Sequence, residues 1–290
     1  MSLTDGLGKK GFLLLAEVDP PKGADPAAFL DGVMGIKGRV DAVAVTDGAH
    51  AIMRMTPLAP CRLLLDRNVE PVMVINGRDR NRISFQGDLL AAWALGVKSV
   101  LIKEGLNPAS GDQPMAKSAG DLNLEMMLQC VQRLNAGKDL AGETLQGPTG
   151  FTAGAIIDVS DDDGKNRRKA EGFSRLAELG VRFVVLGPTY DVNIIDIFKE
   201  AADEAGIDLF ASIMFLKSVA MVRYLNDLPG APSVPHEFLK QMMSTPVKKQ
   251  AGMEIARSFF RDIEPRCRGA VLIALGWGNR LPEFLSLIGR

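Results

Sequence analysis

Eight short apolar runs recur along this chain of 290 residues, and each is followed by a stretch with the spacing of a helix. The runs are continuously apolar rather than alternating, as the strands of a parallel sheet are when helices cover both of its faces. Several of the helical stretches end at a glycine, which is typical of a helix C-terminus. The chain therefore reads as strand, helix, strand, helix throughout. The eight runs cover residues 12–18, 41–46, 71–76, 98–103, 151–158, 182–187, 209–215 and 270–276.

Eight strand–helix units fit a single (β/α)8 TIM barrel, whose usual length is about 250 residues. A doubly wound open sheet is the competing fold, but no G-x-G-x-x-G pattern follows the first run. No linker rich in Pro, Gly or Ser divides the chain, so we predict one α/β domain over residues 1–290. Long loops are expected at 104–121, after the fourth strand, and at 227–238, after the seventh unit.

Two helical stretches can be predicted in more detail. Residues 166–180, "NRRKAEGFSRLAELG", are expected to form one helix that stops at Gly180. The aspartates at 161–163 are candidates to cap its N-terminus. Another helix is expected at 81–96. Its core-facing stripe is predicted to comprise Leu89, Leu90, Trp93 and Ala94.

The composition argues against several classes of function. The net charge of -1 lacks the basic excess of a nucleic-acid-binding surface. The three cysteines lie far apart, without a C-x-x-C pair, and the two histidines cannot form a multi-histidine site, so we predict reduced thiols and no metal. The N-terminus has no signal-peptide core, and no apolar stretch reaches the roughly 20 residues that cross a bilayer. We therefore predict a soluble cytoplasmic protein that binds neither nucleic acid nor membrane.

The carboxyl ends of the strands hold the active site in barrels of this kind, so the residues there are the candidates for chemistry. They include carboxylates and basic groups but no serine–histidine arrangement. Such a set favours acid–base chemistry by a carboxyl group, with basic and hydroxyl groups holding a polyanionic ligand. The candidates are Glu17, Asp19, Thr46, Asp47, Asn76, Arg78, Lys103, Glu104, Asp158, Thr189, Tyr190, Lys217, Trp277, Asn279 and Arg280.

Glu17 is the leading candidate for a catalytic residue. In "FLLLAEVDPPKG" it follows an apolar run directly, and burial beside that run would raise its pKa. A carboxyl group of this kind can stay protonated near neutral pH and donate its proton to a leaving nitrogen or oxygen. The alternative is that Glu17 only forms an ion pair with Lys22, Lys103 or an arginine at the rim of the barrel.

Two charged clusters leave both a structural and a functional interpretation open. "GRDRNR", residues 77–82, is typical of a surface salt-bridge cluster or of a helix N-terminus, but it also follows a strand at the predicted mouth. In "SDDDGKNRRK", residues 160–169, Arg167 and Arg168 either lie on a solvated segment or hold a phosphate group.

Several longer motifs together resemble methylenetetrahydrofolate reductase. They are "EVDPPKG" and "VTDGAH" after the first two strands, "RDRNRISFQGDLLAAWALGVKSVLI" across units three and four, and "GDQPMAKSAGDLNLEMMLQCVQRLNAG". "GMEIARSFFRDI" and "GNR" flank the eighth strand in the same order. The resemblance covers nearly the whole chain and is strongest to the version of the enzyme common in anaerobic bacteria. It implies a (β/α)8 barrel with a flavin, FAD or alternatively FMN. The flavin passes hydride to methylenetetrahydrofolate.

The resemblance also implies roles for individual residues. Glu17 aligns with the family's general acid, which protonates the folate nitrogen that leaves when the five-membered ring opens to an iminium. Thr46 aligns with a threonine beside the flavin, and Ser118 and Ala119 fall in a loop along the cofactor. Substrate contacts are predicted for Asp47, Glu104 and Arg280, and cofactor contacts for Thr46, Asn76, Lys103, Ser118, Ala119, Asp158 and Arg168.

The chain departs from the family pattern at several positions. "KEG" after the fourth strand replaces the usual Gly-Asp, so that Gly105 stands in place of the aspartate. Leu186 and Gly187 replace the Thr-Gln pair after the sixth strand. Gly172 and Leu176 align with an asparagine and a lysine that contact the flavin. Each lost hydrogen-bond partner would cost roughly 1–3 kcal/mol of ligand binding.

These matches and departures leave three hypotheses. The first is a flavin-dependent reductase of methylenetetrahydrofolate or a related pterin, which takes electrons from a nucleotide or a partner subunit. The second is a non-redox barrel that lacks flavin and binds folate or docks on another enzyme of one-carbon metabolism. The third is a relative that acts on another one-carbon substrate, for example in methyl transfer. A homo-oligomer is compatible with each of them.

Overall fold

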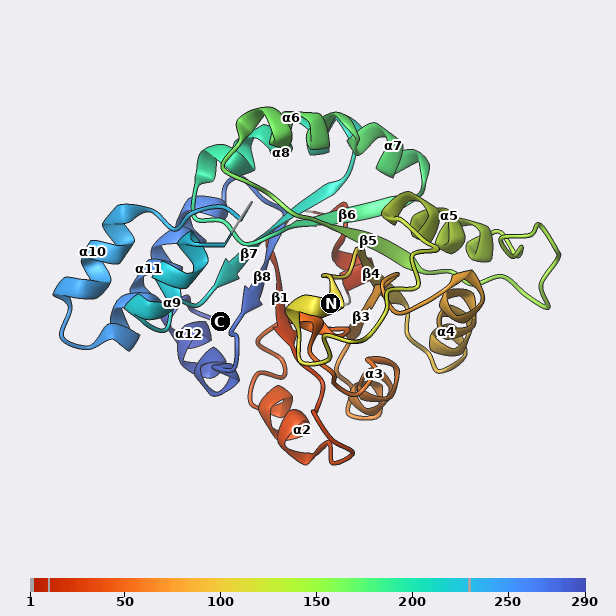
Figure 1. Cartoon of the computed structure of the whole chain (residues 1–290), viewed down its shortest axis with the longest axis horizontal. Helices are drawn as coiled ribbons and strands as arrows, with labels where there is room; N and C mark the ends of the chain where they lie inside the picture. Colours follow the sequence, from red (N-terminus) through yellow and green to blue (C-terminus); the bar gives the residue numbers. More distant parts are fainter. Residues whose placement is uncertain (1–2, 10, 229–230) are drawn as a thin grey trace.

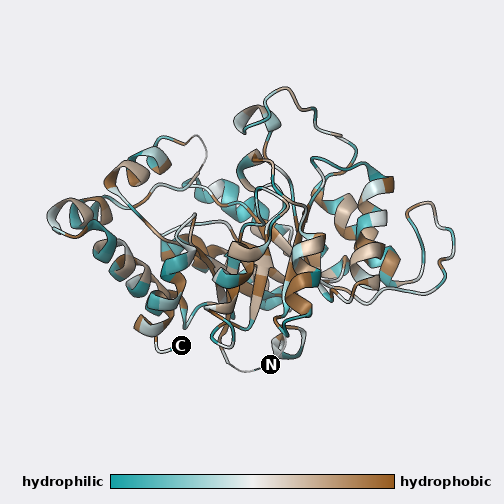
Figure 2. Cartoon of the chain, turned by 90° about the horizontal axis from the view of Figure 1, so that it is seen from below, coloured by the Kyte–Doolittle hydropathy of each residue, from teal (hydrophilic) through white to brown (hydrophobic). Residues whose placement is uncertain are grey.

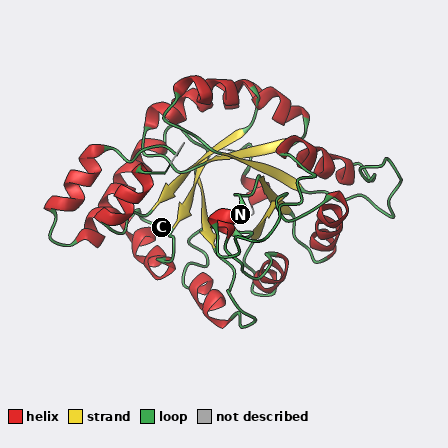
Figure 3. Cartoon of the chain, viewed as in Figure 1, coloured by secondary structure: helices red, strands yellow, loops and turns green. Residues whose placement is uncertain are grey.

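Eight parallel strands form a closed barrel inside a ring of helices in the computed structural model, which describes residues 3–9, 11–228 and 231–290 (Figures 1 and 3). Each strand pairs in parallel with its neighbours in the chain, and the last strand closes on the first. The predicted TIM barrel is confirmed, and every strand overlaps its predicted run. The strands are β1 (Leu13–Val18), β2 (Ala42–Val45), β3 (Pro71–Asn76), β4 (Ser99–Lys103), β5 (Thr152–Ile157), β6 (Val181–Leu186), β7 (Asp208–Met214) and β8 (Gly269–Ile273).

Helices connect successive strands on the outside of the barrel. The α-helices are α1 (Leu3–Gly6), α2 (Ala27–Met34), α3 (Leu58–Leu65), α4 (Arg82–Ala94), α5 (Leu124–Asn135), α6 (Asp163–Glu171), α7 (Phe173–Glu178), α8 (Val192–Ala205), α9 (Val219–Asn226), α10 (His236–Ser244), α11 (Lys248–Ile263) and α12 (Leu281–Leu287). Three short 3-10 turns are η1 (Ala49–Ala51), η2 (Pro108–Ser110) and η3 (Gly278–Arg280). None of the helices in the described part of the chain has the length and apolar character to cross a membrane.

The two predicted loops differ in outcome. Residues 104–121 form a long connection that contains only the short turn η2, as expected. The prediction for 227–238 is wrong at its end, because α10 begins at His236. Pro235 occupies the position before this helix, where a missing backbone N–H leaves no helical hydrogen bond unmade. Residues 229–230 of this predicted loop lie outside the described residues.

The inside of the barrel is filled by alternate side chains of the strands, as the two-residue period of a strand requires. Leu13 and Leu15 of β1, for example, lie in this interior cluster, whereas Leu14 and Ala16 pack against the helices. Two large rings, Phe183 and Phe210, fit inside because Gly154 and Gly269 face them. A Cβ atom at either glycine would lie 2.4 Å from a ring carbon. Figure 2 shows the apolar strands, in brown, at the centre of the molecule.

The stripe of α4 that faces the barrel differs in part from the prediction. Phe85, Leu89 and Ala92 are buried, at spacings of four and three residues. Leu90 is 36% exposed, and Ala94 is also exposed, because both lie on the opposite side of the helix. The prediction was wrong for these two residues because a run of seven apolar or small residues fits more than one helical face.

The helix predicted at 166–180 is wrong as a single element. It begins earlier, at α6, where the Asp162 carboxylate accepts the Lys165 N–H at 3.0 Å and caps the N-terminus as predicted. Gly172 then separates α6 from α7, and its ψ of -6° departs from regular helix geometry. Gly172 therefore places a break in the helical layer next to the strand ends.

Candidate active site

The top layer of the barrel interior is polar, and strand alternation explains which residues form it. Glu17 lies two positions after Leu15, and Lys103 lies two positions after Leu101. Thr46 and Asn76 follow interior residues of β2 and β3 in the same way. Side chains two residues apart point to the same face of a strand, so all four point into the barrel. Four predicted site residues from four strands therefore meet at the carboxyl end of the barrel.

Thr46 is held by a carboxylate from the neighbouring strand end. Its hydroxyl donates a hydrogen bond to Asp19 Oδ1 at 2.6 Å. The other oxygen of Asp19 forms an ion pair with Arg54, 3.3 Å away. Asp19, to which the sequence assigned no role, thus joins the segment after β1 to the segment after β2.

The carboxyl group of Glu17 has no hydrogen bond or ion pair with any residue in the described ranges. Lys22, one of the partners considered for it, binds Asp112 at 2.7 Å instead. Burial in the mouth of the barrel raises the pKa of Glu17 from 4.5 to about 7. The charge of Lys103 lowers this pKa and the charge of Asp19 raises it, both by smaller amounts. The carboxyl group can therefore gain and lose a proton near neutral pH.

A cavity of about 200 Å³ lies directly above these residues. Its floor is apolar and is formed by interior side chains of several strands, among them Val74, Leu101 and Val271. This floor separates the polar layer from bulk solvent below and lowers the local polarity, which is the physical origin of the raised pKa of Glu17. The polar residues that line the cavity are Glu17, Thr46, Asp47, His50, Lys103, Glu104, Asp158 and Ser212.

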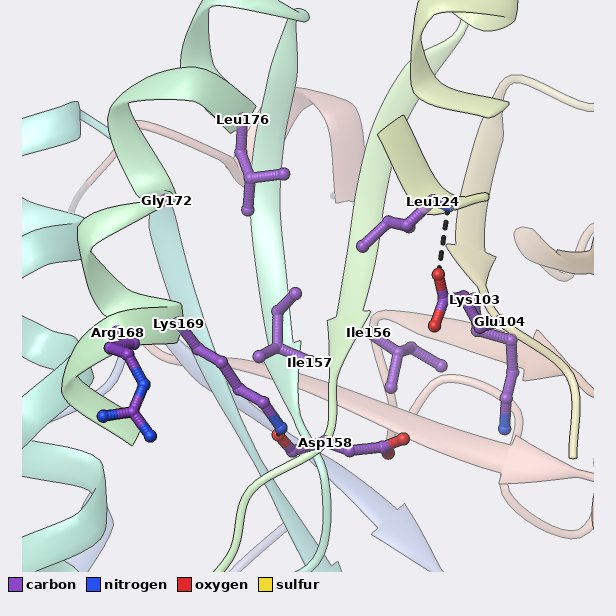
Figure 4. A pocket seen from close by; sticks show the side chains of 10 residues that line it. All are labelled: Lys103, Glu104, Leu124, Ile156, Ile157, Asp158, Arg168, Lys169, Gly172 and Leu176. Atoms are coloured by element: carbon purple, nitrogen blue, oxygen red, sulfur yellow. Dashed lines mark hydrogen bonds between the residues drawn. The ribbon is translucent and has the colours of Figure 1, made fainter. Parts of the chain in front are cut away.

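A second cleft, of about 350 Å³, opens beside the first between α5, α6 and the ends of β4 and β5 (Figure 4). Its walls combine apolar side chains with the cationic side chains of Arg168 and Lys169. The Lys169 ammonium donates to the Asp158 carbonyl oxygen at 2.6 Å, whereas Arg168 makes no hydrogen bond or ion pair with described residues. The two cavities share Lys103, Glu104, Ile156 and Asp158, so they form one continuous site.

Asp47 and Asn76 are largely engaged in a buried network. One oxygen of Asp47, Oδ2, accepts hydrogen bonds from the Asn76 side-chain amide at 2.7 Å and from Arg80 at 2.6 Å. The side-chain oxygen of Asn76, Oδ1, accepts the Arg78 backbone N–H at 3.0 Å. Asn76 is 1% exposed, so its amide holds Asp47 and the turn after β3 in place. Asp47 still lines the mouth cavity.

The remaining predicted site residues lie at different distances from the mouth. Glu104 is exposed where the two cavities join, and it accepts the Leu124 N–H at 3.3 Å (Figure 4). Ser118 and Ala119 are exposed in the long loop, where the Ala119 N–H donates to the Arg78 carbonyl oxygen at 2.7 Å. Arg280 pairs with Glu283 at 2.6 Å and lines a separate pocket between α11 and α12. The structure therefore does not bring these last three together with Glu17.

Two residues of the mouth were missed from the sequence. Ser212 occupies a position of β7 whose side chain points into the barrel. Its hydroxyl donates a hydrogen bond to the Leu186 carbonyl oxygen at 2.7 Å. His50 lies in η1 and lines the mouth cavity beside Lys103. Strand parity could have identified Ser212, but no pattern in "VTDGAH" shows that the turn after β2 folds back over the barrel. The described residues contain no group of three or more metal-binding side chains.

Comparison with known proteins places this site in a family. The model of the methylenetetrahydrofolate reductase family matches residues 3–269, which include strands β1 to β7 and end at the first residue of β8. The chain belongs to this family. No curated protein sequence matches the chain significantly. In this methylenetetrahydrofolate reductase family member, Glu17 and the polar layer around it lie at the carboxyl ends of the strands, where the active sites of such barrels are found.

Solved structures share the fold of this family member at low sequence identity. An uncharacterized protein from Clostridium thermocellum that binds two copies of 5-methyl-5,6,7,8-tetrahydrofolic acid is 10% identical, with a TM-score of 0.67. The match covers 99% of this chain and 98% of that protein. A 2,3-dimethylmalate lyase is 11% identical, with a TM-score of 0.53, over 98% of this chain and 84% of the lyase. At these identities the similarity shows the barrel fold alone.

Proposed function

We propose that this protein reduces 5,10-methylenetetrahydrofolate, or a related pterin, to the 5-methyl form, with Glu17 as the general acid and a bound flavin. The observation that carries the proposal is the Glu17 carboxyl at the mouth of a barrel of this family, which has no partner among the described residues and a pKa raised by burial to about 7. A proton donor is most effective when its pKa lies near the working pH. The folate-binding barrel from Clostridium thermocellum supports a reduced folate as the ligand.

The chemistry requires one proton from the protein. The bond between the bridging carbon and one folate nitrogen breaks, and that nitrogen takes the electron pair and a proton from Glu17. The bridging carbon is left in an iminium with the other nitrogen and then accepts hydride, giving the methyl group. After the transfer Glu17 is an anion, and the nearby ammonium of Lys103 stabilises it, since Lys103 lowers the pKa of this carboxyl.

The continuous site fits a flavin in shape and charge. Its larger cleft of about 350 Å³ is within the roughly 300–1,000 Å³ of small-molecule sites. Ile156, Ile157 and Leu176 offer apolar walls to a planar ring, and the side chain of Arg168, which has no partner among the described residues, could bind a phosphate. A flavin bound there, FAD or FMN, would supply the hydride.

The positions of the other predicted site residues indicate which of them can contact a bound ligand. Lys103, Glu104 and Asp158 lie where the two cavities join, so each can contact the substrate or the cofactor. Thr46 lines the mouth cavity and is held by Asp19, whereas Asn76 acts through Asp47, to which its side-chain amide donates a hydrogen bond. Contacts with Ser118, Ala119 or Arg280 would require a ligand that extends beyond the mouth cavity. Electrons would come from a nucleotide or a partner subunit.

A second candidate function is folate binding without flavin. The wall of the larger cleft favours it, because Gly172 and Leu176 cannot donate a side-chain hydrogen bond to a cofactor. The neighbour from Clostridium thermocellum, which binds two copies of a methylated folate, is consistent with it. In this case Glu17 would bind a folate nitrogen without transferring a proton to a reaction.

Visible absorption of the purified protein, before and after addition of FAD or FMN, separates the two candidates. The reductase predicts a flavin band that bleaches under an external reductant and returns when methylenetetrahydrofolate is added. Glu17→Gln should keep the band and lose turnover. Glu70→Gln is the matched control, because Glu70 is a glutamate with a pKa raised by burial at the opposite end of the barrel. Absence of a band at excess flavin, with 5-methyltetrahydrofolate still bound, would refute the reductase and support the second candidate.

A further inference from the structure

The turn after β2 is held in an unusual backbone conformation. His50 and Ala51 both have positive φ angles, 56° and 55°, and Gly48, two residues before His50, has a φ of 53°. Residues other than glycine avoid this left-handed region because Cβ approaches the following carbonyl oxygen. Such conformations persist only where the surroundings enforce them, and they are concentrated at functional sites.

The long loop after β4 enforces this conformation. Gly111 packs so closely on the turn that a Cβ atom there would lie 1.8 Å from the Ala51 carbonyl oxygen. The next residue, Asp112, accepts the Met53 N–H at 2.8 Å, and Lys22 binds the same carboxylate at 2.7 Å. Two segments far apart in the sequence thus fix the turn against the barrel.

This conformation places the His50 imidazole at the mouth cavity, without a partner among the described residues. His50 is exposed at the rim of the barrel and lines the same cavity as Glu17, and its ring makes no hydrogen bond or ion pair with described residues. Asp19, Lys103 and Arg54 are the charged groups that act on it, and burial lowers its pKa, so the ring is neutral at pH 7. A neutral imidazole offers one hydrogen-bond donor and one acceptor.

We propose that His50 is a ligand-contacting residue whose imidazole hydrogen-bonds the polar edge of a pteridine ring bound in the mouth. The pteridine ring system, with alternating donors and acceptors along its edge, is common to reduced folates and flavins. The inference rests on the proposed function, because it assigns a further residue to the same site. It explains why the chain keeps a left-handed histidine there, since a glycine or an asparagine would adopt this turn more easily.

The test combines ligand affinity with stability. Wild type, His50→Gly and Ala51→Gly are compared by calorimetric titration with 5-methyltetrahydrofolate and, separately, with FMN and FAD, and by thermal unfolding. Both variants relieve a left-handed side chain, but only the first removes the imidazole. We expect His50→Gly to unfold no lower than wild type and to bind one ligand about tenfold or more weakly, while Ala51→Gly binds both ligands as wild type does. The ligand whose affinity falls identifies the ring that His50 contacts.

Proton–carbon NMR adds a direct readout, because the chain has only two histidines. The ring signal of His50 should shift in a saturable manner as ligand is added, while that of His236, exposed at the start of α10, should not. Unchanged affinity of His50→Gly for folate and flavin would overturn the inference alone. If His50→Gly lowered both the melting temperature and the ligand affinity, the inference would also be overturned, because the imidazole would then act by stabilising the turn and not by contacting the ligand. Failure of wild type to bind either ligand would overturn this inference and the proposed function together.

Discussion

The raised pKa of Glu17 makes a quantitative prediction about stability. The carboxyl has a pKa of about 7 in the folded protein and about 4.5 when exposed in the unfolded chain. Between these values the folded state binds a proton that the unfolded state does not, so stability falls as pH rises from about 4.5 to 7. The difference of about 2.5 pKa units, at 1.36 kcal/mol each, corresponds to about 3 kcal/mol. Solvent that reaches the half-buried group screens part of it, which leaves about 2–3 kcal/mol.

Glu17→Gln should therefore stabilise the protein above pH 7. Glutamine resembles the protonated carboxyl, and no protein hydrogen bond is lost, because Glu17 makes none with described residues. An unfolding entropy of about 2.1 cal/mol/K per residue gives about 0.6 kcal/mol/K for 290 residues. The melting temperature of the variant should then exceed that of wild type by about 4 °C at pH 8, and the two should coincide near pH 4.5.

Calorimetric melting of both proteins between pH 4.5 and 8.5 measures this difference directly. Glu200→Gln is the control, because Glu200 is exposed on α8 and has no hydrogen bond or ion pair with described residues. It should follow the wild-type curve at every pH. Parallel curves for wild type and Glu17→Gln would refute the reasoning, since Glu17 would then titrate at the same pH in the folded and unfolded states.

Three further predictions concern the surroundings of Glu17. Replacing Lys103 by Met removes the charge that lowers the pKa of Glu17, so the pH at which kcat/KM falls should rise. An unchanged pH profile would show that Lys103 does not affect the titration of Glu17. Arg80→Leu leaves the buried Asp47 without its ion pair and should lower the free energy of unfolding by about 3 kcal/mol in urea. Arg82→Leu, at an exposed pair, should leave it nearly unchanged. Gly111→Ala should displace the turn that carries His50 and weaken ligand binding, whereas Gly23→Ala, in open space, should not.

The fold was predictable from the sequence because the same strand–helix pattern is repeated eight times along the chain. Eight apolar runs spaced through the chain leave few topologies, and each run buries both faces of its strand. Strand parity also predicts the polar layer: Glu17 and Lys103 point inward because they lie two residues after interior leucines. Local ambiguity caused the errors. The apolar run at 89–95 fits more than one helical face, and Gly172 divides a stretch that reads as one helix.

The parts of the site that come from loops could not be predicted. Asp47 lies at the mouth by sequence, but its carboxylate is engaged by Arg80, a partner 33 residues away. Arg280 follows β8 as expected, yet the turn η3 directs it to Glu283 and away from the mouth. His50 reaches the cavity only because Gly111, 61 residues further on, packs against its turn. Such contacts depend on tertiary packing, and local pattern carries no information about them.

The polar groups left unpaired indicate what the barrel binds. Buried polar groups are normally satisfied, and most of those around the mouth are: Thr46 by Asp19, Asn76 by Asp47, and Ser212 by a backbone carbonyl. Glu17, Lys103 and His50 line the same cavity and lack such partners among the described residues. A carboxylic acid, an ammonium and a neutral imidazole together require a ligand with both acceptors and donors along one edge. A ligand that forms hydrogen bonds with all three groups therefore binds more tightly here than one that contacts fewer of them.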